Sequence, residues 1–189
     1  MTDDLSIIQK VIEGDRGAYA ELVGRYQDRI FRLCRSLLRS TSDAEDAAQE
    51  VFLKAYTSLG RFQKTASFYT WLYRIASNHC LDVIRSSKRR PAESWDALLE
   101  EQGEKMHELL SPAADPRRAM EASELIGRIL ALLRPNYRLI LTLREIEGLS
   151  YQEISDVLDC SIDSVKAQLR RGRAELEERA RHFFPRLGV

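Results

Sequence analysis

Hydrophobic residues recur along this chain at the three- and four-residue spacing of an α-helix, and no segment alternates convincingly as a β-strand would. The pattern predicts a short first helix around Ile7, Ile8 and Val11 that breaks near Gly14. A long second helix is expected over residues 19–37, where apolar residues line one face. The fold class that follows is all-α.

Two capping boxes indicate where later helices begin, because a serine oxygen at such a position can accept the backbone N–H three residues on. A glutamate at that third residue can reach back to the serine N–H. Ser42 and Glu45 form the first box, which predicts a third helix ending near Gly60. Ser150 and Glu153 form the second box, which predicts a short helix.

An acidic, proline-containing stretch separates two helical units. The helix before it begins around Ser67 and stops at Pro91, because a proline disfavours helix in the residue that precedes it. The stretch itself has few apolar residues, which is typical of a tether. We therefore expect two small domains of about four helices each, residues 1–90 and residues 119–189, joined by a flexible linker at 91–118.

The second domain contains a predicted helix-turn-helix. Helices are expected over residues 125–133, from Pro135 to Gly148, over the short capped segment, and from Ser161 onward. A short helix, a turn of about three residues and a longer basic helix is the arrangement of DNA-binding helix pairs. Asp159 lies in the turn, where a left-handed conformation is common and aspartate tolerates it better than most residues.

The last predicted helix carries four cations on its outward side: Lys166, Arg170, Arg171 and Arg173. Such groups can pair with phosphates or donate to guanine edges in the major groove. The alternative is an ordinary helical hairpin with a solvated basic face. The capping boxes, the turn length and the burial pattern together favour DNA contact.

Composition supports a globular protein, with 44% hydrophobic and 31% charged residues. The net charge is zero, but the distribution of charge decides whether a surface suits nucleic acid. One basic cluster, residues 85–90, ends the first domain, and the other lies on the last helix. The acidic linker between them helps to hide both clusters in the total.

The cysteines indicate neither a disulfide framework nor a zinc site. Cys34, Cys80 and Cys160 are odd in number, far apart and without a C-x-x-C pair, which fits buried small hydrophobes in a cytoplasmic protein. No apolar run approaches the roughly 18 residues that a membrane span requires. The acidic start of the chain does not resemble a secretory signal.

Two clusters in the first domain are candidates for chemistry. Asp43, Asp46 and Glu50 share a helix face, but no histidine or cysteine accompanies them, so capping and protein contact are better interpretations than a metal site. The aromatic residues from Phe62 to Tyr73, with cations among and after them, suit stacking on single-stranded nucleic acid. The alternative is a packed aromatic core.

Three long segments resemble extracytoplasmic-function (group 4) sigma factors, and their sigma-E-like branch most closely. These segments are residues 43–56 (DAEDAAQEVFLKAY), 67–76 (SFYTWLYRIA) and 141–154 (LTLREIEGLSYQEI). The resemblance spans about residues 5–181 in the same order. It implies a subunit that binds the β′ and β subunits of core RNA polymerase and directs the enzyme to promoter DNA. No catalytic residue, metal, cofactor or small-molecule substrate is implied.

The resemblance also implies roles for residues that match the family motifs. Those expected to bind core polymerase are Asp46, Gln49, Glu50, Phe52, Leu53 and Tyr56. Those expected to contact the minus-10 element are Phe68, Tyr69, Arg74, Asn78, Asp82, Arg85, Lys88, Arg89 and Arg90, with a loop at 63–67 that holds a flipped base. Those expected to read the minus-35 element are Lys166, Ala167, Gln168, Arg170, Arg171 and Arg173. Asp82 and Gln168 depart from common family residues, so the promoter sequence is not implied.

An anti-sigma factor is a further partner that the resemblance implies; it covers these surfaces until a signal arrives. Such a partner can hold the cytoplasmic protein at the inner membrane. One rival interpretation is a conventional helix-turn-helix regulator that binds an operator without polymerase. Another is an enzyme, but His79, His107 and His182 are scattered and no glycine-rich phosphate loop is present.

Overall fold

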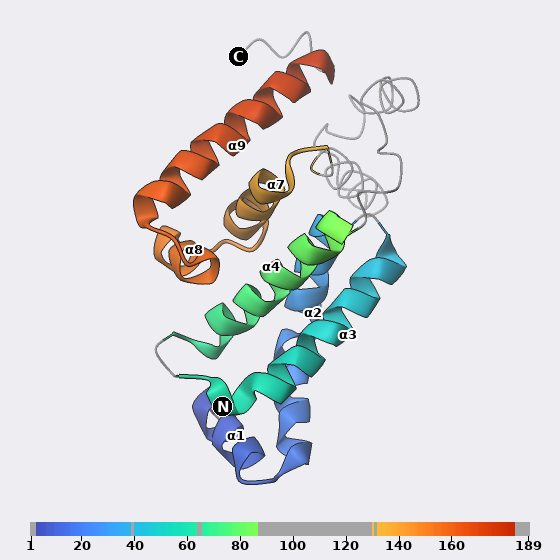
Figure 1. Ribbon diagram of the computed structural model, residues 1–189, viewed down its shortest axis with the longest axis vertical. Helices are drawn as coiled ribbons and strands as arrows, with labels where there is room; N and C mark the ends of the chain where they lie inside the picture. Colours follow the sequence, from blue (N-terminus) through green and yellow to red (C-terminus); the bar gives the residue numbers. More distant parts are fainter. Residues whose placement is uncertain (1–2, 39, 64–65, 87–129, 131, 184–189) are drawn as a thin grey trace, which may run out of the picture.

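The computed structural model describes residues 3–38, 40–63, 66–86, 130 and 132–183, and all regular structure within them is helical. The α-helices are α1 (Asp4–Ile12), α2 (Tyr19–Leu37), α3 (Thr41–Ser58), α4 (Phe68–Ser86), α7 (Pro135–Leu141), α8 (Tyr151–Leu158) and α9 (Ile162–Phe183) (Figure 1). Three short segments, η1 (Arg16–Ala18), η2 (Leu59–Arg61) and the π-helical η4 (Thr142–Ile146), lie between them. This agrees with the predicted all-α class.

The first unit is built around α2, α3 and α4, which pack against one another, with α1 against the start of α2 (Figure 1). The buried face of α3 consists of four alanines and Val51, so its backbone can approach α2 and α4 closely. From α2 and α4 come larger core side chains such as Leu33 and Leu72, both fully buried. Gly14 has φ of 110° and ends the α1 turn, where the sequence predicts a break.

The start of α3 differs from the prediction. Its N-cap is Ser40, whose side chain accepts the backbone N–H of Asp43 at 3.2 Å, so the capping box predicted at Ser42 is wrong. Ser40 is followed three residues later by Asp43, and Ser42 by Glu45, so the local sequence fits a helix start at either serine. Leu38, directly after α2, is buried, and the cap at Ser40 follows two residues later.

The second unit contains the predicted helix-turn-helix. Asp159 is left-handed (φ 51°, ψ 52°) and joins α8 to α9, while Ser161 accepts the N–H of Ser164 at 3.2 Å. Fully buried Val165 and Leu169 hold α9 against its neighbours. A Cβ at Gly172 would lie 3.4 Å from Leu141 and Tyr137, so glycine there permits α9 to pack closely on α7.

The helix predicted from Pro135 to Gly148 is α-helical only as far as Leu141. Residues 142–146 widen into a π-helix, and Gly148 (φ 72°) ends the segment. Periodicity alone does not reveal one inserted residue, because the apolar positions on either side remain near helical spacing. The helix predicted over residues 125–133 and the linker at 91–118 lie outside the described residues, except for Leu130, Leu132 and Leu133.

The two units pack directly on each other. Helix α4 lies against α7 and α8, and α2 lies against α7 and η4 (Figure 1). The buried apolar residues of both units belong to a single cluster. Within the described part of the chain, no helix is long and apolar enough to cross a membrane.

The capping box at Ser150 has both hydrogen bonds: Ser150 Oγ accepts from Glu153 N at 3.2 Å, and Glu153 Oε2 accepts from Ser150 N at 2.8 Å. We expect Ser150→Ala to destabilise α8 by about 1 kcal/mol, seen as roughly fivefold faster amide exchange in that helix.

The hydroxyl and N–H of Ser150 lower the pKa of Glu153. Because the native pKa is depressed, this stabilisation exists above the unfolded value of about 4.3 and is lost as pH falls through the native pKa.

Amide exchange in α2 serves as the internal control for Ser150→Ala, since that helix belongs to the first unit. Exchange in α8 that is unchanged at pH 7 would contradict the role given to the cap. The wild-type and Ser150→Ala proteins should converge as the medium is acidified.

Candidate functional site

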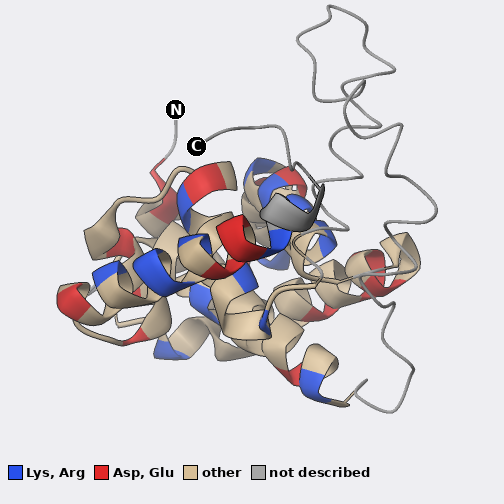
Figure 2. Ribbon diagram, turned by 90° about the horizontal axis from the view of Figure 1, so that it is seen from above, with Lys and Arg blue, Asp and Glu red and all other residues tan. Residues whose placement is uncertain are grey.

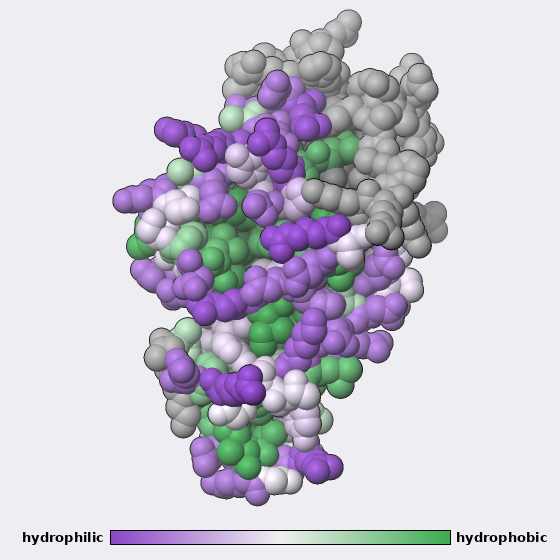
Figure 3. Space-filling view, in the orientation of Figure 1, coloured by the Kyte–Doolittle hydropathy of each residue, from purple (hydrophilic) through white to green (hydrophobic). Residues whose placement is uncertain are grey.

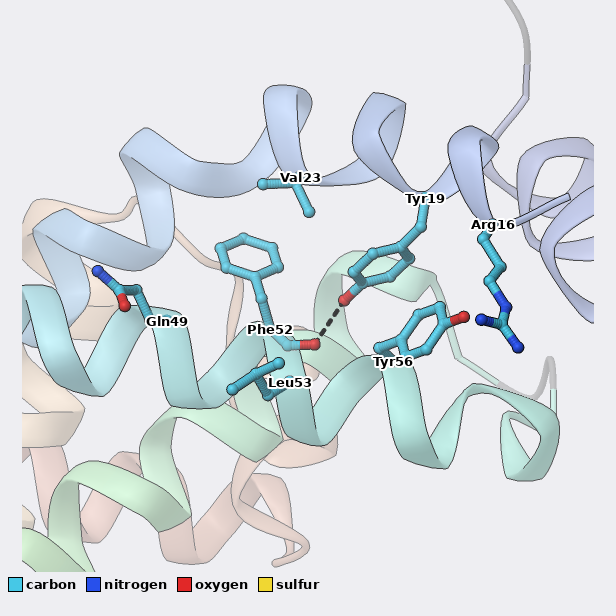
Figure 4. Close-up of a pocket in the computed structure, with 7 residues that line it drawn as sticks. All are labelled: Arg16, Tyr19, Val23, Gln49, Phe52, Leu53 and Tyr56. Atoms are coloured by element: carbon cyan, nitrogen blue, oxygen red, sulfur yellow. Dashed lines mark hydrogen bonds between the residues drawn. The ribbon is translucent and has the colours of Figure 1, made fainter.

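An apolar groove lies between α2 and α3 in the first unit. It has a volume of about 520 Å³ and is lined by Arg16, Tyr19, Val23, Gln49, Phe52, Leu53 and Tyr56 (Figure 4). The Tyr19 hydroxyl donates to the Phe52 carbonyl at 2.8 Å and so ties the two helices together. Its ring packs edge-on against Tyr56 with centroids 5.0 Å apart. Burial raises the pKa of Tyr19, which keeps this donor protonated.

The groove is open to a protein partner. Leu53 is 60% exposed on its edge, the largest exposed fraction among the large hydrophobic residues of the described chain. Arg16 stands at one end, and Asp46 and Glu50 are exposed on the same helix as Leu53. An apolar recess with a charged rim can receive apolar side chains from another protein and orient it by charge.

Four of the six predicted polymerase-binding residues line this groove, and Asp46 and Glu50 lie on the exposed side of α3. The opposite side is formed by Arg16 of η1 and by Tyr19 and Val23 of α2, which the sequence does not identify as binding residues. Tyr19 and Val23 belong to the apolar face of the second predicted helix, and that pattern indicates the core. No local signal in the sequence distinguishes a groove wall from the core itself.

A second, smaller pocket lies where the chain enters α4. Its volume is about 160 Å³, and it is lined by Arg61, Phe62, Gln63, Ala66, Thr70, Trp71 and Arg74. Ser67 Oγ accepts the N–H of Thr70 at 3.1 Å and so fixes the start of the helix. Phe62 and Trp71 form an aromatic wall with centroids 5.3 Å apart.

Two arginines and a glutamine therefore line the same pocket as this aromatic wall, and the Arg74 guanidinium donates to the Asp156 carbonyl of α8. A planar ring with hydrogen-bonding edges, joined to a phosphate, fits such a lining, because rings stack on aromatic side chains while cations attract the phosphate. The loop at 63–67, predicted to hold a flipped base, contributes Gln63 and Ala66, and residues 64–65 lie outside the described range. Arg61 is not among the residues that the sequence singles out.

The aromatic residues divide between core and surface. Phe68 is 2% exposed and its ring lies within about 6 Å of Tyr26, Phe62 and Trp71, so we assign it to the core instead of the DNA-contact surface. Tyr69 is partly exposed, and the Arg29 guanidinium lies 5.4 Å from its ring centroid. The packed-core interpretation therefore accounts for Phe68.

The remaining predicted minus-10 residues are on α4 or come after it in the sequence. Asn78, Asp82 and Arg85 are exposed, and Arg85 Nη1 pairs with Asp82 Oδ1 at 3.0 Å. Arg74 is half-buried, and its Nε donates to the Asp156 carbonyl of α8, in the other unit, at 3.1 Å. The last three, Lys88, Arg89 and Arg90, lie outside the described residues.

The outer side of α9 carries the predicted minus-35 residues. Lys166, Arg170 and Arg171 are exposed, whereas Ala167 and Gln168 are half-buried. Arg173 pairs with Glu145 of η4 at 2.7 Å, whereas Lys166 pairs with Asp163 of its own helix at 3.6 Å. Basic residues (blue) occur on helices of both units with acids between them (Figure 2). On the face that Figure 3 shows, hydrophobic residues (green) form separate patches among hydrophilic ones (purple).

The cysteine and histidine side chains of the first unit contact other residues of that unit. The Sγ atoms of Cys34 and Cys80 are 3.6 Å apart in the core, and the hydrogen bond between them, together with burial, raises the pKa of Cys80. Burial and the nearby Lys54 ammonium lower the pKa of His79. The described residues contain no group of three or more histidine, cysteine or acidic side chains suited to a metal ion.

Comparison with known families gives two matches. Residues 22–90 match the model of sigma-70 region 2, and residues 123–176 match that of sigma-70 region 4. The RNA polymerase sigma-H factor of Pseudomonas aeruginosa is 34% identical over 178 residues, covering 93% of this chain and 92% of that protein. The ECF RNA polymerase sigma-E factor of Escherichia coli is 33% identical over 189 residues, covering 98% of each.

Two solved structures share the fold. CnrH in complex with the cytosolic domain of CnrY superposes with a TM-score of 0.67 at 23% identity, covering 93% of this chain and 95% of that one. The sigma factor RpoE of Bartonella quintana, in complex with the anti-sigma factor NepR, gives a TM-score of 0.61 at 18% identity, with 86% and 96% covered.

Proposed function

The chain belongs to the extracytoplasmic-function (ECF) sigma factors of the sigma-70 family, and on that premise we propose that it binds core RNA polymerase and directs it to particular promoters. Residues 1–90 form the polymerase-docking and minus-10 domain, 91–118 the linker and 119–189 the minus-35 domain. The family matches at 22–90 and 123–176 support this division.

The groove between α2 and α3 is the proposed docking site for the β′ and β subunits. An apolar recess with Leu53 exposed at its edge supports this assignment, because the centre of a protein interface is usually a desolvated apolar anchor inside a polar rim. Asp46 and Glu50 supply the acidic part of that rim. This groove, in the same chain as a helix-turn-helix, is the observation that carries the proposal.

The pocket at the start of α4 is the proposed site for a base extruded from the minus-10 element. Unstacking a base costs a few kcal/mol, and a pocket with a stacking wall and hydrogen-bond donors offsets that cost. Arg61 and Gln63 supply the donors, Arg74 adds positive charge to the lining, and Trp71 forms the wall. Tyr69, Asn78 and Arg85 extend the contact along α4, followed by Lys88, Arg89 and Arg90.

We expect Arg61→Ala to slow promoter opening by roughly tenfold, since a hydrogen bond to a charged group contributes about 1.5–3 kcal/mol. Arg61 is exposed and lies outside the docking groove, so core binding should not change. Opening is measured from the fluorescence of a base analogue placed in the minus-10 element. Lys10→Ala, an exposed cation on α1, is the control, and an unchanged opening rate in Arg61→Ala would remove this residue from the pocket's function.

The exposed face of α9 is the proposed reader of the minus-35 element, through Lys166, Arg170 and Arg171, with Ala167 and Gln168 beside them. Cations at the exposed side of a recognition helix meet the phosphates and guanine edges of the major groove. The ion pair with Glu145 partly neutralises the charge of Arg173, so we assign Arg173 mainly to holding α9 against η4.

On this proposal the protein acts in the cytoplasm, where polymerase and promoter DNA are found, as a binding subunit rather than as an enzyme. An anti-sigma factor holds it inactive until a signal arrives. That two solved proteins of the same fold are complexes, one with a named anti-sigma factor, supports this last step. Purification of the tagged protein from its own bacterium should return such a partner; polymerase alone, under every growth condition, would argue against it.

Size-exclusion chromatography of the protein with purified core polymerase tests the docking step. Co-elution at equimolar stoichiometry is expected. A protein that never co-elutes with core but binds an operator sequence tightly by itself is a conventional regulator instead.

A further inference from the structure

A lysine and a histidine meet on the surface of the first unit, where α3 packs against α4. Lys54 Nζ lies 2.8 Å from His79 Nδ1. The Lys54 side chain is exposed, and that of His79 is half-buried. An ammonium group has only donors, so it donates a hydrogen bond and the unprotonated Nδ1 of the imidazole accepts it. The ring proton of the neutral imidazole is therefore on Nε2.

The imidazole is not the partner that the local sequence favours for this lysine. Glu50 precedes Lys54 by four residues on α3, the spacing at which glutamate and lysine pair on a helix surface. Among the described residues Lys54 nevertheless forms no ion pair. Of the other two lysines that the structure describes, Lys166 pairs with Asp163, and Lys10 is exposed on α1. Lys54 is thus the described lysine whose nitrogen contacts an imidazole.

The surroundings of His79 favour the neutral form of its ring. Burial lowers the pKa of His79 below its ordinary value of about 6.5, and the Lys54 ammonium lowers it further. Glu50 of α3 and Asp82 of α4 act in the opposite direction. Because the net shift is downward, most of the imidazole is unprotonated near pH 7 and can accept a proton.

We propose that Lys54 is an acylation site, at which its amine takes an acetyl group from an activated small-molecule donor and His79 serves as the general base. Two classes of donor supply this chemistry, acyl phosphates and acyl thioesters. The 2.8 Å separation meets the requirement for a general base, which must lie within about 2.6–3.2 Å of the atom whose proton it takes. Because the Lys54 side chain is exposed, a small donor reaches it from solvent.

The transfer balances without any further reactant. The reactive form is the free amine, which arises when the Lys54 ammonium loses one proton to solvent. Its lone pair attacks the acetyl carbonyl carbon, and as the N–C bond forms the nitrogen becomes a cation whose proton passes to His79 Nδ1. The C–O bond to phosphate, or the C–S bond to the thiol carrier, breaks with its electron pair. The imidazolium then returns its proton to the leaving group.

The product is a neutral amide in place of an ammonium group. Acetylation therefore removes a positive charge from the exposed side of α3, directly after Leu53 and one turn after Glu50. The inference goes beyond the proposed function, since the reaction requires only the free chain and a donor.

The test is the acetylation rate of each lysine in the full-length free protein, followed by mass spectrometry of its proteolytic peptides. Separate reactions contain acetyl phosphate and acetyl-coenzyme A, so the two donor classes are distinguished. Lys10 is the internal reference in every sample. We expect Lys54 to react roughly tenfold faster than Lys10 with at least one donor. This factor is smaller than the roughly 100-fold or more of general bases in enzymes, because the donor arrives from solvent.

His79→Asn separates a base from a mere hydrogen-bond acceptor, because a side-chain amide can accept from Lys54 but cannot take up a proton. This variant should reduce the Lys54 rate to that of Lys10 and leave the Lys10 rate unchanged. Circular dichroism checks that its helix content is retained. Lys54 that reacts no faster than Lys10 with either donor, or a faster reaction that persists in folded His79→Asn, would overturn the proposal.

The pH dependence of the wild-type protein provides a second measurement that needs no variant. The ratio of the Lys54 rate to the Lys10 rate should fall as the pH drops through the lowered pKa of His79, because the imidazolium cannot act as a base. A ratio that stays constant between about pH 5 and 8 would exclude His79 as the base. Neither measurement uses polymerase or DNA, so their outcome is independent of whether transcription assays support the sigma function.

Discussion

Leu53→Glu will weaken the binding of this protein to core RNA polymerase by about 100-fold or more. Leu53 is 60% exposed at the edge of the groove between α2 and α3. An apolar anchor at the centre of an interface typically contributes about 2–4 kcal/mol. A carboxylate in its place adds the cost of desolvating a charge, and it stands on the same helix as the acids Asp46 and Glu50.

The measurement is a titration of labelled protein with core polymerase, followed by fluorescence anisotropy. Because Leu53 is exposed, the substitution should leave the helix content and melting temperature unchanged. Leu5→Glu is the matched control, since Leu5 is 40% exposed on α1 and lies outside the groove. Wild-type affinity in Leu53→Glu would mean that polymerase docks elsewhere on the protein.

Charge reversal of Lys166 and Arg170 will reduce transcription from promoters with a minus-35 element by about 100-fold. Both side chains are exposed on α9, and neither is part of the domain core. Each base or phosphate contact contributes about 1–3 kcal/mol, and glutamate in its place also repels the DNA backbone. Binding to core polymerase should be unaffected, since the docking groove belongs to the other domain.

The salt dependence of holoenzyme binding to promoter DNA distinguishes a lost contact from a misfolded domain. Removing phosphate contacts should reduce the slope of log affinity against log salt by about one for each contact. Lys10→Glu, on α1, controls for the reversal of one exposed cation outside α9 and should leave the slope as it is. Transcription by the Lys166→Glu, Arg170→Glu protein at the wild-type level would exclude α9 as the reader.

The helix-turn-helix could be predicted from sequence because its signals are local. Ser150 and Glu153 meet within one turn, Ser161 caps α9, and Asp159 adopts the left-handed conformation expected of it. The start of α3 could not be decided locally, because Ser40 and Ser42 are each followed by an acid three residues later, and the structure has the cap at Ser40. The π-helical turn after Leu141 is likewise invisible to periodicity.

The residues of the candidate sites could be predicted only where they belong to a sequence motif. The α3 side of the groove follows from the family resemblance, but Arg16, Tyr19 and Val23 enter it through the packing of α2 on α3. Arg61 becomes part of the base pocket only once the chain has turned into α4. Phe68 is one of several aromatic residues in the sequence, and only the fold shows that its ring is buried.

The interface between the two domains is the feature that the sequence predicts least. Arg138 and Glu147 are charged residues on a helical segment, and most such residues are exposed to solvent. Their burial arises from contacts across roughly 70 to 100 positions, with Leu37 and Tyr73, for which no spacing rule exists. A buried charge in a predicted surface position is thus the sign of an interface that only the tertiary structure reveals.

Run-off transcription with purified core polymerase tests the central claim most directly. The templates are a pool of genomic promoter fragments from the source bacterium, with and without this protein. We predict discrete new transcripts that require the protein and whose start sites share two spaced upstream motifs, and we predict their loss with Leu53→Glu. No protein-dependent transcript from any fragment, with a core preparation that responds to another sigma factor, would contradict the assignment.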